Sequence, residues 1–153
     1  MTTLQEGDPA PDFIGLDHKG RKRSLSKYRG KKLILFFYPQ DNTPTCTIEV
    51  CNLKTNYRKL KKMGFELLGV SPDSARKHQN FIDKFKLPFP LLVDTERKVI
   101  LDYKVWGPKV TFGKHYDGLY RTTFIINEEG IIEKVFTKVE SKRHAEQILE
   151  AIM

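Results

Sequence analysis

The sequence predicts an α/β protein whose central mixed β-sheet is covered by helices on both faces. Two continuous apolar runs, at residues 32–38 and 65–71, have the length and composition of buried strands. An amphipathic segment at residues 74–85 has helical spacing and follows the second run. Because strands that alternate with helices usually join one sheet with helices on both of its faces, these observations define the fold class.

The other predicted elements continue this alternation toward both ends of the chain. A helix is expected after the first buried strand, and Ser141 is expected to cap a last helix that ends at Ile152. The remaining predictions are an N-terminal β-hairpin at 13–17 and 21–25, a strand at 91–94, a helix at 96–103, and a hairpin at 122–127 and 131–139. Residues 108–120 have no clear assignment.

Length and composition indicate one soluble domain spanning residues 1–153. A chain of 153 residues buries a sufficient core without disulfide or metal support, and 39% hydrophobic with 30% charged residues is typical of globular proteins. No stretch approaches the roughly 18 apolar residues of a membrane helix. Residues 1–8 lack the basic start and apolar run of a secretion signal, so we expect a cytoplasmic protein without a membrane partner.

The net charge of +8 raises the alternative of a nucleic-acid-binding module, since clustered Lys and Arg side chains release counterions from phosphates. The basic clusters at 19–23 and 59–62 are short and carry no interleaved aromatic residues. Their positions fit a hairpin tip and the polar end of a helix. We therefore expect a solvated basic surface and no nucleic-acid partner.

The two cysteines are too few for a disulfide scaffold or a four-cysteine zinc site, and in a cytoplasmic protein they indicate redox chemistry. The four histidines are scattered without ligand spacing, which argues against a metal site. Four residues separate Cys46 from Cys51, whereas thioredoxin-like disulfide oxidoreductases use a Cys-x-x-Cys pair. That spacing disfavours a disulfide oxidoreductase.

Cys46 lies where a predicted strand leads through a polar loop into a helix. Thr43 is a good N-cap and Pro44 a good first helical residue, so Cys46 takes the third helical position, where backbone N–H groups lack partners. Helix N-termini and nearby cations lower the pKa of a free cysteine from about 8.5 to roughly 3.5–7.5. Cys46 is therefore a candidate nucleophile, and a buried inert cysteine is the alternative.

Cys51 follows five residues later, which in a helix is a rise of about 7.5 Å and a net rotation of about 140°. Cysteines whose Cα atoms are more than about 7 Å apart cannot be bridged without backbone movement, so a Cys46–Cys51 disulfide requires local unwinding. Cys51 shares its side of the helix with Lys54 and Arg58 and is expected near the surface. A chance exposed thiol is the alternative.

The sequence resembles the peroxiredoxins, and within them the bacterioferritin comigratory, or Q-type, branch. The resemblance covers nearly the whole chain and is most specific in the spacing of Pro39, Thr43 and Cys46, with Cys51 five residues further on. It also includes GDPAPDF at 7–13, GVS at 69–71, LPFPLL at 87–92, VWG at 105–107 and TFII at 123–126, shortly after Arg121.

The resemblance implies a thioredoxin-like fold with an N-terminal β-hairpin and a thiol peroxidase activity toward hydrogen peroxide and organic hydroperoxides. It implies that Cys46 is the peroxidatic cysteine and that Thr43 hydrogen-bonds the thiolate and the peroxide. Pro39 would shape the pocket, and Arg121 would stabilise the thiolate and the developing charge. The Cys46 sulfenic acid would condense with Cys51 to a disulfide, which thioredoxin or a similar dithiol would reduce.

By the same resemblance no metal, flavin or haem is required, and a monomer is expected, with a dimer as the alternative. Gln40, Thr45 and Asn127 replace the lysine, glycine and aspartate that are common in this branch. Thr45 restricts the backbone at the point expected to unwind, which predicts slow disulfide formation and over-oxidation of Cys46. A redox sensor that binds a partner through the oxidised segment without turnover is the remaining rival function.

Overall fold

The computed structural model describes residues 1–152, and Met153 lies outside the described residues. The strands are β1 (Ile14–Asp17), β2 (Lys22–Ser24), β3 (Lys32–Phe37), β4 (Phe65–Ser71), β5 (Leu91–Val93), β6 (Trp106–Thr111), β7 (Lys114–Leu119), β8 (Thr122–Ile126) and β9 (Ile132–Phe136). The α-helices are α1 (Pro44–Thr55), α2 (Tyr57–Lys62), α3 (Ala75–Phe85), α4 (Lys98–Asp102) and α5 (His144–Ile152). Two 3-10 turns are η1 (Leu25–Tyr28) and η2 (Ser141–Arg143).

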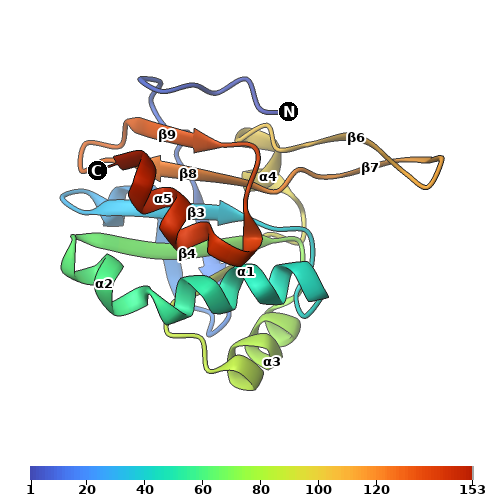
Figure 1. The fold of residues 1–153 in the computed structure, drawn as a ribbon, viewed down its shortest axis with the longest axis horizontal. Helices are drawn as coiled ribbons and strands as arrows, with labels where there is room; N and C mark the ends of the chain where they lie inside the picture. The colour runs from blue at the N-terminus through green and yellow to red at the C-terminus, as the bar shows by residue number, and fades with distance from the viewer. Residues whose placement is uncertain (153) are drawn as a thin grey trace.

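A mixed sheet forms the centre of the fold (Figure 1). Within residues 1–152 it has seven strands in the order β2-β1-β5-β4-β3-β8-β9. The central strands β3, β4 and β5 are parallel, while β1 joins β5 and β8 joins β3 in the antiparallel direction. The predicted N-terminal hairpin is the β1–β2 pair.

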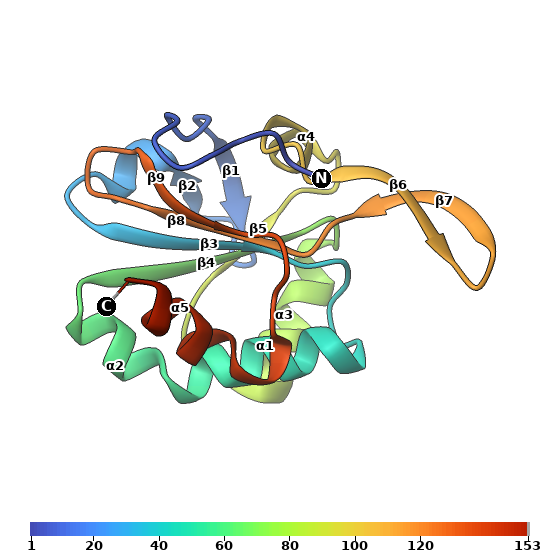
Figure 2. The same cartoon turned by 45° about the horizontal axis from the view of Figure 1, so that its top comes forward.

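Side chains alternate along β3 and so supply two apolar clusters, one on each face of the sheet. Leu33, Leu35 and Phe37 belong to the cluster that α4 and η1 cover. Ile34 and Phe36 belong to the cluster that α1, α2, α3 and α5 cover. Figure 2 shows these four helices on one side of the sheet and α4 on the other. The predicted fold class, a central mixed sheet with helices on both faces, is confirmed.

The structure corrects several predicted boundaries. The helix after β3 is interrupted at Asn56, so that α1 and α2 are separate helices. Ser141 does not cap α5, because it lies inside the 3-10 turn η2, whose own N-cap is Glu140. The predicted helix at 96–103 is reduced to α4, and β9 ends at Phe136 rather than at residue 139.

The unassigned segment 108–120 belongs mostly to a β-hairpin of β6 and β7, which projects from the body of the protein (Figures 1 and 2). Its turn places Phe112 at φ 51° and Gly113 at φ 77°, and Phe112 is fully exposed. A phenylalanine rarely takes a left-handed conformation, and the usual sequence signal of a two-residue hairpin turn is Asn-Gly or Asp-Gly. This turn has only the glycine of that signal. No helix among residues 1–152 combines the length and the apolar character needed to cross a membrane.

Candidate active site

Cys46 lies in the first turn of α1, at the end of the loop that follows β3. Thr43 is the N-cap residue and Pro44 the first helical residue, as predicted, so Cys46 is the third residue of the helix. The Cys46 side chain is 1% exposed and belongs to the apolar cluster between α1 and the sheet. The sulfur is therefore shielded from bulk water at the end of the helix where backbone N–H groups concentrate positive charge.

Arg121 is a cation that forms a hydrogen bond with this sulfur. Strand β8 pairs antiparallel with β3, and Thr122 lies opposite Phe37, the last residue of β3. Arg121 directly precedes Thr122 and therefore lies at the end of β3 from which the loop starts. Arg121 Nη2 donates to Cys46 Sγ at 3.3 Å. Burial alone would lower the pKa of Arg121, but the neighbouring Glu49 and Cys46 raise it above its ordinary value. Arg121 therefore carries its charge throughout the physiological pH range.

Glu49 is a site residue that the sequence reasoning missed. It lies one turn after Cys46 in α1, its side chain is fully buried, and Oε1 accepts from Arg121 Nη1 at 2.6 Å. Within residues 1–152 its second oxygen, Oε2, has no hydrogen-bond partner. Burial raises the pKa of Glu49 to about 7, although Arg121 acts in the opposite direction. The sequence did contain a signal for this residue, because Glu49 is a charged side chain at helical spacing from Cys46, on the side of the helix that also carries the apolar residues Val50 and Leu53.

Thr43 and Pro39 border the same loop. The Thr43 hydroxyl donates to the Gln40 carbonyl at 3.0 Å and does not cap α1 with its side chain. A hydrogen bond from Thr43 to a thiolate or a peroxide therefore requires rotation of this hydroxyl. Pro39 is half-buried and precedes Gln40 directly. Among the five predicted site residues, all of which lie within the described part of the chain, one side-chain hydrogen bond is present, from Arg121 to Cys46.

Cys51 lies further along α1 and is half-buried, and both cysteines are free thiols. The next residue, Asn52, binds the last helix. Asn52 Oδ1 accepts from Ala145 N at 2.7 Å, and Nδ2 donates to the Glu146 carboxylate at 3.0 Å. Unwinding that brings Cys51 to Cys46 thus involves the first part of α1, whereas the helix from Asn52 onward is tied to α5.

Among residues 1–152, Asp41, Asp73 and His78 form the one group of three side chains close enough to hold a metal ion. Their ligand atoms are already engaged in hydrogen bonds. His78 Nδ1 lies 2.7 Å from Asp41 Oδ2, and Asp73 Oδ2 accepts from the Asp41 backbone at 2.7 Å. The Ser71 hydroxyl also donates to Asp73 at 2.7 Å. This geometry is that of a hydrogen-bonded network rather than of a metal centre.

The fold and the cysteine site together define a thiol-dependent redox enzyme with a thioredoxin-like fold. Residues 6–135 match the AhpC/TSA family. The peroxiredoxin Bcp of Bacillus subtilis is 41% identical over 150 residues, covering 98% of this chain and 96% of that protein. The peroxiredoxin Bcp of Escherichia coli is 38% identical over 149 residues, covering 97% of this chain and 96% of that protein.

Solved structures agree with these relatives. A structure of Xanthomonas campestris peroxiredoxin Q superposes with a TM-score of 0.87 at 31% identity and covers 98% of this chain and 95% of its own. The structure of peroxidoxin BcpB from Mycobacterium tuberculosis gives a TM-score of 0.84 at 29% identity, with 98% and 99% coverage. The chain belongs to the AhpC/TSA family, in its peroxiredoxin Bcp, or Q-type, branch. It is a thiol peroxidase, as the resemblance to the peroxiredoxins implied.

Proposed function

We propose that the chain reduces hydrogen peroxide and organic hydroperoxides through a Cys46 sulfenic acid and a Cys46–Cys51 disulfide, which a thioredoxin-type dithiol reduces. The observation that carries this proposal is the 3.3 Å hydrogen bond from Arg121 to the sulfur of Cys46 at the start of α1. A guanidinium and a helix N-terminus beside a cysteine sulfur both favour the thiolate, which is the nucleophilic form of cysteine.

The first step is attack of the Cys46 thiolate on one oxygen of the peroxide. The O–O bond breaks, its electron pair goes to the departing oxygen, and that oxygen takes a proton and leaves as water or an alcohol. Sulfur retains the other oxygen as sulfenic acid. Arg121 donates beside the reacting sulfur, where negative charge shifts from sulfur to oxygen, so it stabilises the transition state. Rotation of the Thr43 hydroxyl would add a second donor, and Pro39 would limit the access of water.

The second step is attack of the Cys51 thiol on the sulfenic sulfur. The hydroxyl group leaves as water, an S–S bond forms, and no further oxidant is needed. Because the two cysteines lie on one helix with four residues between them, the first part of α1 must leave its helical conformation. An external dithiol then reduces the disulfide by exchange and restores both thiols.

We further propose that residues 1–153 act as one thioredoxin-like domain, as a monomer in the cytoplasm and without a nucleic-acid or membrane partner. The separation of the basic clusters supports the part of this proposal that concerns nucleic acid. Lys19, Arg21 and Lys22 are exposed in the β1–β2 hairpin, where Arg23 is half-buried and paired with Asp17, while the exposed lysines at 59–62 lie on α2. Such dispersed charge is typical of a solvated surface.

Dithiol-coupled peroxide turnover tests the proposed function in the intact protein and two variants. Cys46→Ser is expected to abolish turnover, because the nucleophile is lost. Cys51→Ser is expected to be oxidised by peroxide at the parent rate but to recycle poorly, because no intramolecular disulfide forms. Equal turnover by all three proteins would reject the assignment, and oxidation of the parent protein without any turnover would favour the redox sensor.

A further inference from the structure

Asp41 lies in the middle of the loop that carries the site residues, between Pro39 and Thr43, and its side chain is only 3% exposed. The Tyr38 hydroxyl donates to Asp41 Oδ1 at 2.5 Å, and His78 Nδ1 lies 2.7 Å from Oδ2. Burial and the adjacent Asp41 carboxylate raise the pKa of Tyr38 well above its ordinary value, so its hydroxyl remains a donor. The loop before Cys46 is thus bound through one side chain to α3.

His78 has a defined protonation pattern in this network. Its side chain is fully buried, and Nε2 lies 2.9 Å from the Leu92 carbonyl oxygen. A carbonyl oxygen only accepts, so Nε2 must carry a hydrogen. One further proton lies between Nδ1 and Asp41 Oδ2, because a bare imidazole nitrogen and a carboxylate cannot hydrogen-bond to each other. The His78–Asp41 contact is therefore a hydrogen bond in which one proton joins two buried groups.

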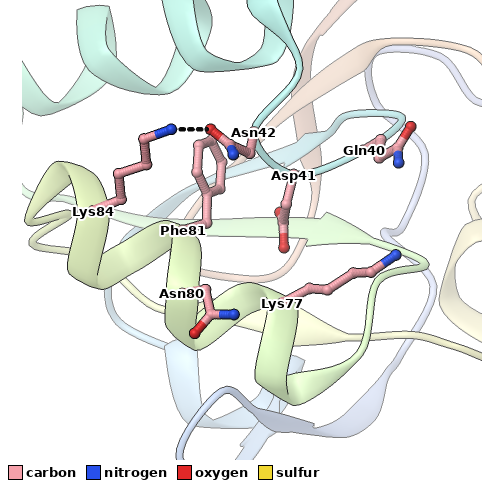
Figure 3. A pocket seen from close by; sticks show the side chains of 7 residues that line it. All are labelled: Gln40, Asp41, Asn42, Lys77, Asn80, Phe81 and Lys84. Atoms are coloured by element: carbon pink, nitrogen blue, oxygen red, sulfur yellow. Dashed lines mark hydrogen bonds between the residues drawn. The ribbon is translucent and has the colours of Figure 1, made fainter.

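Packing alone does not hold this loop in place. A cavity of about 240 Å³ lies between the loop and α3, lined by residues of both, and none of Thr43, Cys46 and Arg121 lines it. Figure 3 shows Asp41 directed from the loop toward α3, and Lys84 bonded to Asn42 across the cavity at 3.2 Å. Asn42 has φ 61°, a left-handed conformation that is uncommon for residues with a side chain, although asparagine tolerates it better than most.

We propose that His78 is a positioning residue of the peroxidase reaction, which acts through Asp41 to hold the 39–43 loop and hence the Cys46 sulfur in the geometry for attack. This inference rests on the proposed function. His78 contacts neither substrate nor sulfur. It fixes the backbone between Pro39 and Thr43, and through Thr43, the N-cap, it fixes the start of α1. A displacement of about 1 Å at a reacting group lowers a rate by about 100-fold, so a loosened loop has a measurable effect.

Asp41→Asn and Asp41→Ala form a matched pair that tests the network. In Asp41→Asn, the amide nitrogen can donate to Nδ1 of a neutral His78, and the amide oxygen can still accept from Tyr38. Every hydrogen bond of the network then remains. In Asp41→Ala the side-chain link to the loop is lost and only the backbone bond from Asp41 N to Asp73 remains. A His78 ring with its one hydrogen on Nε2 still donates to the Leu92 carbonyl, so the substitution requires no unpaired buried charge. His78→Leu removes the link from the other side.

The measurement is the second-order rate constant for oxidation of Cys46 by hydrogen peroxide, in a Cys51→Ser background that prevents disulfide formation. Alkylation of Cys46 by iodoacetamide is measured in parallel, because it reports thiolate reactivity without the peroxide geometry. We expect Asp41→Ala and His78→Leu to lower the peroxide rate by about 10- to 100-fold, with alkylation changed by less than about threefold. We expect Asp41→Asn to stay within about threefold of the parent in both reactions.

A core variant on a different helix, Leu149→Ala in α5, serves as the control for a general loss of stability, with chemical denaturation measured for every protein. Parent-like peroxide oxidation of Asp41→Ala would overturn the proposal, as would a loss no larger than that of an equally destabilised Leu149→Ala. An equal loss in Asp41→Asn and Asp41→Ala would also overturn it, since hydrogen-bond geometry would then not be the cause. A parent protein that fails to react with peroxide would instead reject the proposed function itself.

Discussion

Arg121 donates to the sulfur of Cys46 at 3.3 Å, although the two residues are 75 positions apart in the sequence. The same guanidinium donates through its other terminal nitrogen to Glu49, so the position of Arg121 is set from two sides. A planar group held in this way presents a donor to the sulfur in a fixed direction. The position of the positive charge beside Cys46 therefore depends on α1, which carries Glu49, and on β8, which Arg121 directly precedes.

Replacement of Arg121 by lysine tests the guanidinium geometry. Arg121→Lys keeps the positive charge but cannot bind Cys46 and Glu49 through two nitrogens of one plane. We expect the rate constant for peroxide oxidation of Cys46 to fall by about 100-fold, the usual effect of losing one transition-state donor. Rapid mixing with hydrogen peroxide measures it. Arg143→Lys, at an exposed arginine paired with Glu140, is the control and should change little. Equal rates in both variants would contradict the role of Arg121.

The protonation of Glu49 predicts a pH dependence of stability. Its pKa is raised from 4.5 to about 7 by burial, with Arg121 opposing, so between these values the folded chain binds a proton that the unfolded chain does not. The stability contributed by Glu49 is therefore fully present below pH 4.5 and is lost as the pH rises through about 7. Across the whole range, such a shift lowers the free energy of unfolding by about 3 kcal/mol.

His144 has the opposite dependence over a similar range. Burial lowers its pKa from 6.5 to about 4, with the hydrogen bond to Gln147 opposing, so its contribution is present above pH 6.5 and is lost toward pH 4.

The Glu49 shift is tested by replacing this residue with glutamine. We expect Glu49→Gln to gain stability relative to the parent by about 3 kcal/mol between pH 4.5 and 7, as the burial penalty on the parent carboxylate grows. Urea unfolding at several pH values measures this difference. A constant difference would show that Glu49 does not titrate in this range.

Thr45 is predicted to slow the unwinding of α1. It is exposed at the second position of the helix, and its β-branched side chain restricts the backbone there. Thr45→Gly is expected to speed disulfide formation and to reduce sulfinic acid on Cys46 after a peroxide pulse, both measured by mass spectrometry. Thr55→Gly, at the other end of α1, is the matched control and should not alter this partition. A parent protein that forms disulfide without sulfinic acid even at high peroxide would contradict the prediction.

The contacts of Asn52 with α5 predict a local loss of stability. Asn52→Ala leaves the buried Ala145 amide without its 2.7 Å partner and removes the bonds to Glu146. An unsatisfied buried group costs about 1–3 kcal/mol, so the free energy of unfolding should fall by that amount. Chemical denaturation measures it, and hydrogen exchange should show faster exchange in α5. Asn80→Ala, at an exposed position of α3, should change stability by less than about 0.5 kcal/mol. An Asn52→Ala variant with the free energy of unfolding of the parent would show that the contact between Asn52 and α5 contributes little to stability.

Local patterns predicted most of the architecture correctly. The apolar runs became β3 and β4, and the Ser74 side chain caps α3 by accepting from Lys77 N, at the predicted start of that helix. Patterns failed where the signal was weak, as in the β6–β7 hairpin, whose turn uses Phe112 in a left-handed conformation. The C-terminal helix was predicted, but the prediction of Ser141 as its cap was wrong, because the 3-10 turn η2 precedes the helix and moves its first residue to His144.

The sequence by itself determined the chemistry, because the spacing of Thr43, Pro44 and Cys46 is enough to place a sulfur in the first turn of a helix, and that placement depends only on local backbone geometry. Only the tertiary structure decided which groups surround that sulfur. Arg121 reaches it through strand pairing across the sheet, and His78 reaches the loop from a helix 37 positions away from Asp41. Contacts of this kind arise from the packing of distant segments, for which no local pattern in the chain carries a signal.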